Sequence, residues 1–207
     1  GNSADVRGGG IYNDGTANLT NSTVSGNSAD FGGGIFNSYY GTANLTGSTV
    51  SGNSADYGGG ISNDGTATLT NSTVSGNSAT GNFSNGGGIY NNGTANLTNS
   101  TVSGNSAEDE GGGIFNDDGG DDTLTLINSI VANSITNGAD GGDLYNENVG
   151  NTLGIINASF SLIEDNADEI NGTDNSNIKD QDPLLDPAGL QDNGGVTKTI
   201  ALAANSP

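Results

Sequence analysis

A unit of about 25 residues occurs five times between residues 1 and 134. Each copy reads close to Gly-Gly-Gly-Ile-Tyr/Phe-Asn, followed by Gly-Thr-Ala-Asn-Leu-Thr-Asn-Ser-Thr-Val-Ser-Gly-Asn-Ser-Ala. The isoleucine after the glycine triplet returns after 24, 26, 28 and 25 residues, at Ile11, Ile35, Ile61, Ile89 and Ile114. Such a period is the signature of stacked units, none of which can bury its apolar face alone. The repeat therefore predicts an elongated solenoid.

Each repeat has the pattern of short β-strands joined by tight turns. In the second copy, Ala43 and Leu45 alternate with Thr42, Asn44 and Thr46, which is the period of a strand with one buried face. No segment shows the helical period, and the 37 glycines would be costly inside helices. Strands of successive repeats then stack in parallel about 4.8 Å apart. The prediction is an all-β parallel β-helix (β-solenoid) of about six or seven coils.

Several positions of the repeat are predicted to form rows along the stack. The interior rows are the isoleucines together with Leu19, Leu45, Leu69, Leu97, Leu126, Val24, Val50, Val74, Val102 and Val131. Asparagines in register can form side-chain amide ladders. Two such rows are Asn13, Asn37, Asn63, Asn91, Asn116 and Asn27, Asn53, Asn77, Asn105, Asn133. The glycine triplets mark corners that have no room for a Cβ atom.

An aromatic residue follows the isoleucine in most copies, and Ser62 interrupts the series. The aromatic residues are Tyr12, Phe36, Tyr90, Phe115 and Tyr145. Alternation places them outside if the isoleucines point inside. An external aromatic stack binds sugar rings or a neighbouring chain, or it only stiffens the rod.

The repeat loses its regularity after residue 134. We expect β-helix coils over residues 1–171, with regular repeats over 1–134 and degenerate coils over 135–171. Residues 172–207 are turn-rich and acidic, and they are expected to form a C-terminal capping or assembly segment. Within it, residues 196–202 alternate like a last strand.

The quoted repeat resembles those of secreted bacterial right-handed parallel β-helix proteins, and it is similar to the Gly-Gly-Ala-Ile repeats of chlamydial polymorphic outer-membrane proteins. The C-terminal part resembles the end of choice-of-anchor surface proteins, on the residues Asp182-Pro183-Leu184-Leu185, Asp192-Asn193-Gly194-Gly195-Val196 and Ser206-Pro207. Together these resemblances cover nearly the whole chain. They imply a right-handed coil, which agrees with the crossover rule for parallel strands. They also imply export, but they name no reaction.

Composition restricts the partners and the location of the chain. The 24 acidic residues stand against three basic ones, and the net charge of −21 repels nucleic acid and anionic membranes. No apolar run is long enough for direct membrane insertion. We therefore expect an acidic protein in an extracellular or cell-surface location.

The chain lacks the residues that most catalytic sites need. It has no histidine and no cysteine, so the common nucleophilic triads are excluded. Glycosidases use two carboxylates about 5 to 9.5 Å apart. Asp14 with Asp64, or Asp30 with Asp56, approach that spacing, but both pairs occupy turns of near-identical repeats. The expectation is that the protein is not an enzyme, with no catalytic residue, and a carbohydrate-active β-helix enzyme is an alternative.

Calcium is the one cofactor for which the sequence offers candidate ligands. Ca²⁺ takes six to eight oxygens, commonly in glycine-rich acidic loops. The candidate metal ligands are Asp117, Asp118, Asp121, Asp122, Asp140 and Asp143. A solvated acidic loop is the competing interpretation.

One strand face is predicted to carry a regular hydroxyl array. Its surface candidates are Thr16, Thr20, Thr42, Thr46, Thr66, Thr68, Thr70, Thr94 and Thr98. Such an array resembles the flat faces of ice-binding proteins, although threonine suits any exposed β position. Asn-x-Ser/Thr triplets make the chain a candidate glycoprotein. They begin at Asn18, Asn21, Asn44, Asn71, Asn82, Asn92, Asn96, Asn99, Asn157 and Asn171.

These features favour a structural or adhesive surface component, with an ice-binding protein as an alternative. The chain opens within a repeat, at Gly1-Asn2-Ser3-Ala4-Asp5, so its first coil has no visible cap. Open solenoid edges recruit other chains. The expected partners are therefore another copy, in a head-to-tail homo-oligomer or filament, or an extracellular polysaccharide.

Overall fold

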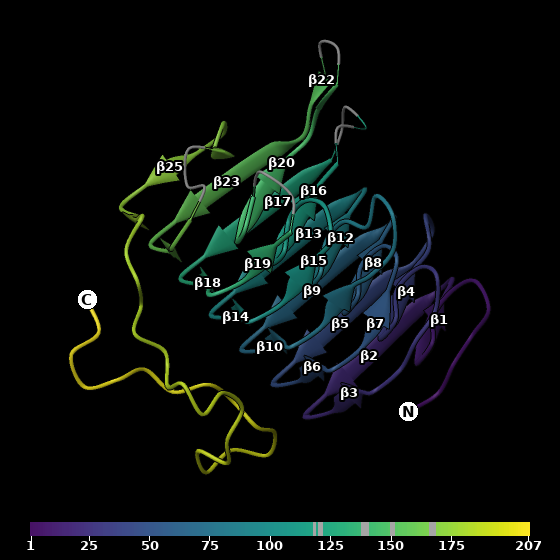
Figure 1. The fold of residues 1–207 in the computed structure, drawn as a ribbon, viewed down its shortest axis with the longest axis horizontal. Helices are drawn as coiled ribbons and strands as arrows, with labels where there is room; N and C mark the ends of the chain where they lie inside the picture. The colour runs from purple at the N-terminus through teal and green to yellow at the C-terminus, as the bar shows by residue number, and fades with distance from the viewer. Residues whose placement is uncertain (118, 120–121, 138–140, 150–151, 166–168) are drawn as a thin grey trace.

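The protein is an almost all-β solenoid whose strands stack in parallel, with the coils running from β1 at one end of the molecule to β23 and β25 at the other (Figure 1). The computed structural model describes residues 1–117, 119, 122–137, 141–149, 152–165 and 169–207. The stack makes about 5 turns. The β-solenoid predicted from the repeat is confirmed.

Three long sheets and one narrow sheet run along the stack. The isoleucine sheet contains β1 (Ile11–Asn13), β4 (Ile35–Asn37), β8 (Ile61–Asn63), β12 (Ile89–Asn91), β16 (Ile114–Asn116) and β20 (Leu144–Asn146). The threonine sheet contains β2 (Thr16–Thr20), β5 (Thr42–Thr46), β9 (Thr66–Thr70), β13 (Thr94–Thr98), β17 (Thr123–Ile127), β23 (Ile155–Ser159) and β25 (Asp174–Asn175).

The serine sheet contains β3 (Thr23–Ser25), β6 (Thr49–Ser51), β10 (Thr73–Ser75), β14 (Thr101–Ser103), β18 (Ile130–Ala132), β24 (Leu162–Ile163) and β26 (Ile178–Lys179). The narrow sheet contains β7 (Ser54–Ala55), β11 (Ser78–Ala79), β15 (Ser106–Ala107) and β19 (Ile135–Thr136). A separate antiparallel hairpin joins β21 (Asn148–Val149) to β22 (Thr152–Leu153). The predicted six or seven coils exceed the about 5 turns of the stack, since the seven strands of the two longest sheets include last strands of only two residues each.

The apolar core is built from the three predicted interior rows. In the register of the sheets, each isoleucine, leucine and valine lies on its counterpart in the next coil, as Leu69 lies on Leu97. Ile35, Val50 and Leu126 have no more than 1% of their surface exposed. Ile11 and Leu19 belong to the first coil and are only partly buried against the core.

Two asparagine ladders run beside this core. In the first, each Nδ2 donates to the Oδ1 of the next coil, from Asn13 to Asn37 at 2.7 Å and onward to Asn146. In the second, both the backbone N–H and Nδ2 of Asn53 donate to Oδ1 of Asn77, at 3.0 and 2.9 Å. Buried amides are thus paired with one another, which removes the cost of burying them unbonded.

The predicted last member of the second ladder, Asn133, was wrong by one residue. Val131 aligns with Val102, so Ser134 occupies the rung, and its hydroxyl accepts the backbone N–H of Asn105 at 3.4 Å. Asn133 has a φ of +58°, the left-handed conformation that Gly104 adopts in the coil before it. Asparagine tolerates this conformation better than other residues that carry a Cβ atom.

Glycine at the corners is required by close backbone approach. A Cβ atom added to Gly34 would lie 2.6 Å from the carbonyl oxygen of Gly60 in the next coil. Gly32 has a φ of +64°, which disfavours other residues whatever the space. The predicted tight corner is therefore confirmed at this triplet.

The aromatic row is less exposed than alternation indicated. Phe36 and Phe115 are each only 1% exposed, whereas Tyr12 at the first coil is 52% exposed. Neighbouring rings stack at centroid distances between 5.2 and 5.6 Å, as Tyr90 does on Phe115. The guanidinium of Arg7 covers Phe36 at 4.9 Å from the ring centroid. Two of the five rings are therefore buried and two are partly buried, so the row is not an open binding surface.

A second aromatic pair fills the gap that Ser62 leaves. Phe31 stacks on Tyr57, and the Tyr57 ring meets the edge of Tyr90 at a centroid distance of 5.5 Å. Because Ser62 lies in register between Phe36 and Tyr90, the row would otherwise be interrupted at this coil. The aromatic contacts thus continue through a neighbouring turn.

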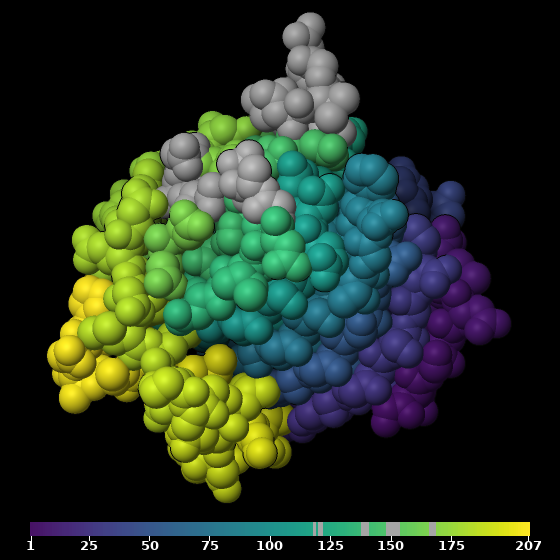
Figure 2. All heavy atoms as spheres, in the orientation of Figure 1, coloured from purple at the N-terminus to yellow at the C-terminus, as the bar shows by residue number. Residues whose placement is uncertain are grey.

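Residues 181–207 form a C-terminal arm that folds back along the solenoid. After β26 the chain runs back over the flank, and Figure 2 shows the arm as a separate mass against the coils. Two antiparallel bridges, Leu185 with Leu202 and Gln191 with Thr199, fold the arm on itself. The hydroxyl of Thr49 donates to the carbonyl of Lys198 at 2.9 Å, and the hydroxyl of Thr197 donates to the carbonyl of Gly47 at 2.7 Å. The arm therefore contacts the second coil, far from where it leaves the stack.

Replacement of one interior leucine tests the stacked core. We predict that Leu69→Asp unfolds the neighbouring coils, because an unpaired buried charge costs several kcal/mol. The control is Thr68→Asp, since Thr68 points outward on the same strand. Far-UV circular dichroism with urea unfolding measures both variants. Equal midpoints for the two would contradict the assigned faces.

The second ladder predicts a separate cost for losing one amide. Asn77 is 1% exposed, and its Nδ2 donates to Asn105 and to the carbonyl of Val50. Asn77→Ala also leaves the donors of Asn53 unpaired, so we expect a loss of about 3 kcal/mol or more. The control Asn96→Ala, on the outward threonine face, should cost well under half as much. Urea denaturation compares them, and similar losses would contradict a stabilising ladder.

Candidate functional site

The predicted threonine array forms the outward face of the threonine sheet. Its strands alternate between partly exposed threonine or asparagine and buried alanine or leucine. Thr16, Thr42, Thr66 and Thr94 lie in register, and Thr20, Thr46, Thr70 and Thr98 form a second column. Thr68 lies in a third column, between Asn44 and Asn96. The nine predicted surface threonines are thus brought together on one face.

Most of the predicted glycosylation asparagines are accessible, in three settings. Asn18, Asn44, Asn96 and Asn157 belong to the threonine face, where Asn44 Nδ2 donates to Asn18 Oδ1 at 2.9 Å. Five of the asparagines lie at exposed turn positions, namely Asn21, Asn71, Asn82, Asn92 and Asn99. The Asn171 side chain is tied to the backbone, with Oδ1 accepting Ile156 N–H and Nδ2 donating to the Gly154 carbonyl. Glycosylation itself remains a prediction.

The two carboxylate pairs considered for glycoside chemistry lie at turns. Asp14 and Asp64 are two coils apart, because Ser38 occupies the intervening rung and donates its hydroxyl to Asp14. Asp30 and Asp56 are on consecutive coils, with the Asp56 N–H donating to the Asp30 carbonyl at 2.9 Å. Both members of the second pair are exposed. Burial raises the pKa of Asp64, opposed by a hydrogen bond from Asn92.

The predicted calcium ligands do not form one cluster within the described part of the chain. Asp118, Asp121 and Asp140 lie outside the described residues. Asp117 accepts the Tyr90 hydroxyl, and the carboxylate of Asp122 accepts the N–H of Gly119 at 2.9 Å. Where residues are described, no group of three acidic side chains is placed to hold a metal ion. Calcium binding stays a prediction.

Asp143 closes the second asparagine ladder. It stands at the position of the third glycine of the triplet, next to Leu144, which aligns with Ile114. Its Oδ1 accepts the backbone N–H of Ser134 at 2.7 Å, as Oδ1 of each ladder asparagine does in earlier coils. Burial raises the pKa of Asp143 to about 7, and the Ser134 hydrogen bond opposes this rise while Glu164 and Asp165 add to it. The final rung is thus a carboxyl group in place of an amide.

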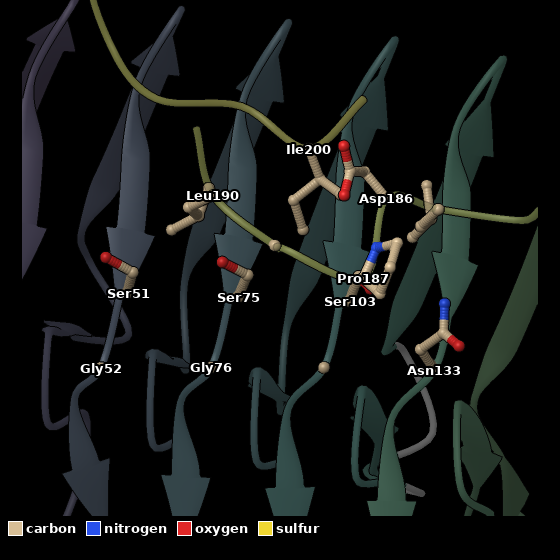
Figure 3. Close-up of a pocket in the computed structure, with 13 residues that line it drawn as sticks. Ser51, Gly52, Ser75, Gly76, Ser103, Asn133, Asp186, Pro187, Leu190 and Ile200 are labelled. Atoms are coloured by element: carbon tan, nitrogen blue, oxygen red, sulfur yellow. The ribbon is translucent and has the colours of Figure 1, made fainter. Parts of the chain in front are cut away.

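A cavity between the C-terminal arm and the serine sheet was not predicted from the sequence. Its volume is about 540 Å³, and Figure 3 shows Ser51, Ser75 and Ser103 on successive strands opposite arm residues. The arm side includes Leu185, Asp186, Pro187, Leu190 and Ile200. No sequence signal revealed this cavity, because the arm lies outside the repeat and reaches coils that are distant in the chain.

Asp143 gives a pH-dependent prediction. The unfolded carboxyl group ionises near 3.8 and the folded one near 7. Between these values only the unfolded chain loses the proton, so the contribution of Asp143 to stability falls as the pH rises to about 7. We predict that Asp143→Asn is close to wild type at about pH 4 and more stable at about pH 8. Urea midpoints at both pH values check this, with the exposed Asp56→Asn as control. A gain that is equal at both pH values would contradict the buried carboxyl.

Comparison with known proteins gives one match. The family described as the Chlamydia polymorphic membrane protein repeat matches residues 99–117, which run from the turn before β14 to the turn after β16. No curated protein and no solved structure matches the chain. Within the described residues, no helix is long and apolar enough to cross a membrane. A polymorphic membrane protein repeat within a β-solenoid fits a surface-exposed repeat protein.

Proposed function

We propose that this chain is a structural and adhesive component of a bacterial cell surface, and not an enzyme. The observation that carries the proposal is the outward threonine face, on which the same polar side chains recur in register from β2 to β13. A periodic face offers many equivalent weak contacts, and such contacts reinforce one another when they engage together. The matched surface-protein repeat supports the location.

The proposed partners are a second copy of the chain or an extracellular polysaccharide. The strands β1, β2 and β3 each lie at the end of their sheets within the described chain. A further coil placed there would extend the sheets, and head-to-tail addition does not close on itself, so it produces a filament. With a net charge of −21, calcium bridging is proposed as an aid to side-by-side contact between rods.

Surface location and adhesion are tested on the intact protein. Antibodies against the repeat should label unpermeabilised cells of the native bacterium, and beads coated with the chain should adhere to polysaccharide-coated surfaces. Labelling only after permeabilisation would overturn the surface assignment. Beads coated with a Thr42→Ala/Thr66→Ala/Thr94→Ala variant are the matched control and should adhere several-fold less, since one column of the face loses its hydroxyls.

The proposed head-to-tail assembly into filaments is tested separately. Electron microscopy of the concentrated chain, with and without Ca²⁺, should show filaments of constant width. A strict monomer in light scattering would remove the filament and leave a surface rod.

Ice binding is the second candidate function, because the threonine face presents hydroxyls in columns on consecutive coils. The same protein solution tests it by thermal hysteresis. Growth-arrested ice crystals, with hysteresis lost in the triple alanine variant, would favour ice over adhesion.

A further inference from the structure

Two serine rows run along the solenoid, and they differ in how their hydroxyl groups are satisfied. In the first row each hydroxyl is bonded within the stack: Ser72 Oγ donates to the Thr70 carbonyl at 3.0 Å and accepts the Ser48 N–H at 3.2 Å. The second row is Ser51, Ser75 and Ser103. Among the described residues, no hydrogen-bond partner is found for these three hydroxyls. The chain thus keeps a polar row that the fold itself does not use.

The second row is covered, although it points away from the core. Its serines alternate with the inward valines, and yet Ser75 is only 5% exposed and Ser103 only 4% exposed. The C-terminal arm lies over this row, and Leu185, Leu190 and Ile200 line the space above it. The hydroxyls of Ser75 and Ser103 face the cavity, where water or a ligand can supply the bond that the protein does not.

The cavity over this row has the size and lining of a small-molecule site. Its volume of about 540 Å³ lies within the range of about 300–1,000 Å³ that is usual for ligand pockets. The floor is the serine row with Gly52, Gly76 and Gly104, whose lack of side chains leaves the space open. The roof is largely aliphatic and comes from Leu185, Pro187, Leu190 and Ile200 of the arm.

The charges around the cavity select the class of ligand. No lysine or arginine lines it, so a phosphate or carboxylate has no cationic partner there. Its one carboxylate, Asp186, already accepts the N–H of Ala188 and the Nε2 of Gln191, both at 2.9 Å. What remains is a regular row of neutral hydroxyls, with the Asn133 amide beside it, opposite aliphatic groups. A neutral sugar matches this arrangement, since it offers hydroxyls along its edge and C–H groups on its face.

We propose that the cavity between the arm and the serine sheet binds a short neutral saccharide. The hydroxyls of Ser51, Ser75 and Ser103 bond to successive sugar hydroxyls, and Leu190 and Ile200 lie against the ring faces. The arm closes over the ligand as a strap. This inference rests on the proposed adhesive function in naming a saccharide, and it adds to the threonine face a second site that takes a short saccharide in the cavity.

Isothermal titration calorimetry of the 207-residue chain tests the proposal. The probes are cello-, malto- and chito-oligosaccharides, with oligogalacturonate as the charged comparison. We expect at least one neutral probe to bind and oligogalacturonate to bind more weakly. Ser75→Ala/Ser103→Ala should weaken binding by at least about tenfold, because two hydrogen bonds are lost. These serines bond to no described residue, so the variant should keep the wild-type circular dichroism spectrum and urea midpoint.

The matched control is Ser78→Ala/Ser106→Ala, which removes two partly exposed hydroxyls from the narrow sheet on the same coils and should leave binding unchanged. Binding that survives Ser75→Ala/Ser103→Ala, or that is lost to the same extent in the control, would overturn the cavity site and leave adhesion through the threonine face standing. Tighter binding of oligogalacturonate would overturn the neutral class. No binding by any probe would overturn the saccharide and would not touch the surface location, which cell labelling tests separately.

Discussion

The fold depends on the pairing of buried amides with one another along the stack. This solenoid has few large apolar side chains and therefore a narrow core. Some of the side chains that fill the coil are consequently polar and buried. The chain places asparagine where the coil turns, and each Asn Oδ1 accepts from the coil before it, as Asn77 does from Asn53. This works only if each coil repeats the last in register. Regular sequence is therefore a condition for burying these amides at all.

The interior and the open threonine face were predictable from local pattern. Period-2 alternation and repeat spacing need only neighbouring residues, and they placed Leu69 inside and Thr68 outside. The one-residue error at Asn133 arose where the repeat loosens, because spacing alone does not distinguish a rung from the left-handed residue before it. Burial of Phe36 was missed because Arg7 comes from another part of the coil.

The cavity at the serine row was beyond prediction for a related reason. The contacts that create it join Thr49 to Lys198, which are 149 residues apart. The arm has no repeat of its own, so the repeat does not predict which coils the arm contacts. The structure of the stack is thus specified by local repetition. The position of the arm is specified by contacts between residues that are distant in the sequence. The first carries the periodic face, and the second creates the cavity over the serine row.

The asparagine ladders also give the rod a chemical direction. Every Nδ2 of the first ladder donates toward the C-terminal coil, from Asn13 to Asn146, where the last donates to the Gly154 carbonyl. At the first coil the Oδ1 of Asn13 is the acceptor that faces outward along the ladder, with the Gly15 N–H beside it at 3.3 Å. The two ends are therefore unlike, because the first coil presents an acceptor while the last amide donor is bonded within the chain. Two rods placed first coil to first coil would set acceptor against acceptor, so the ladder disfavours contact between two first coils.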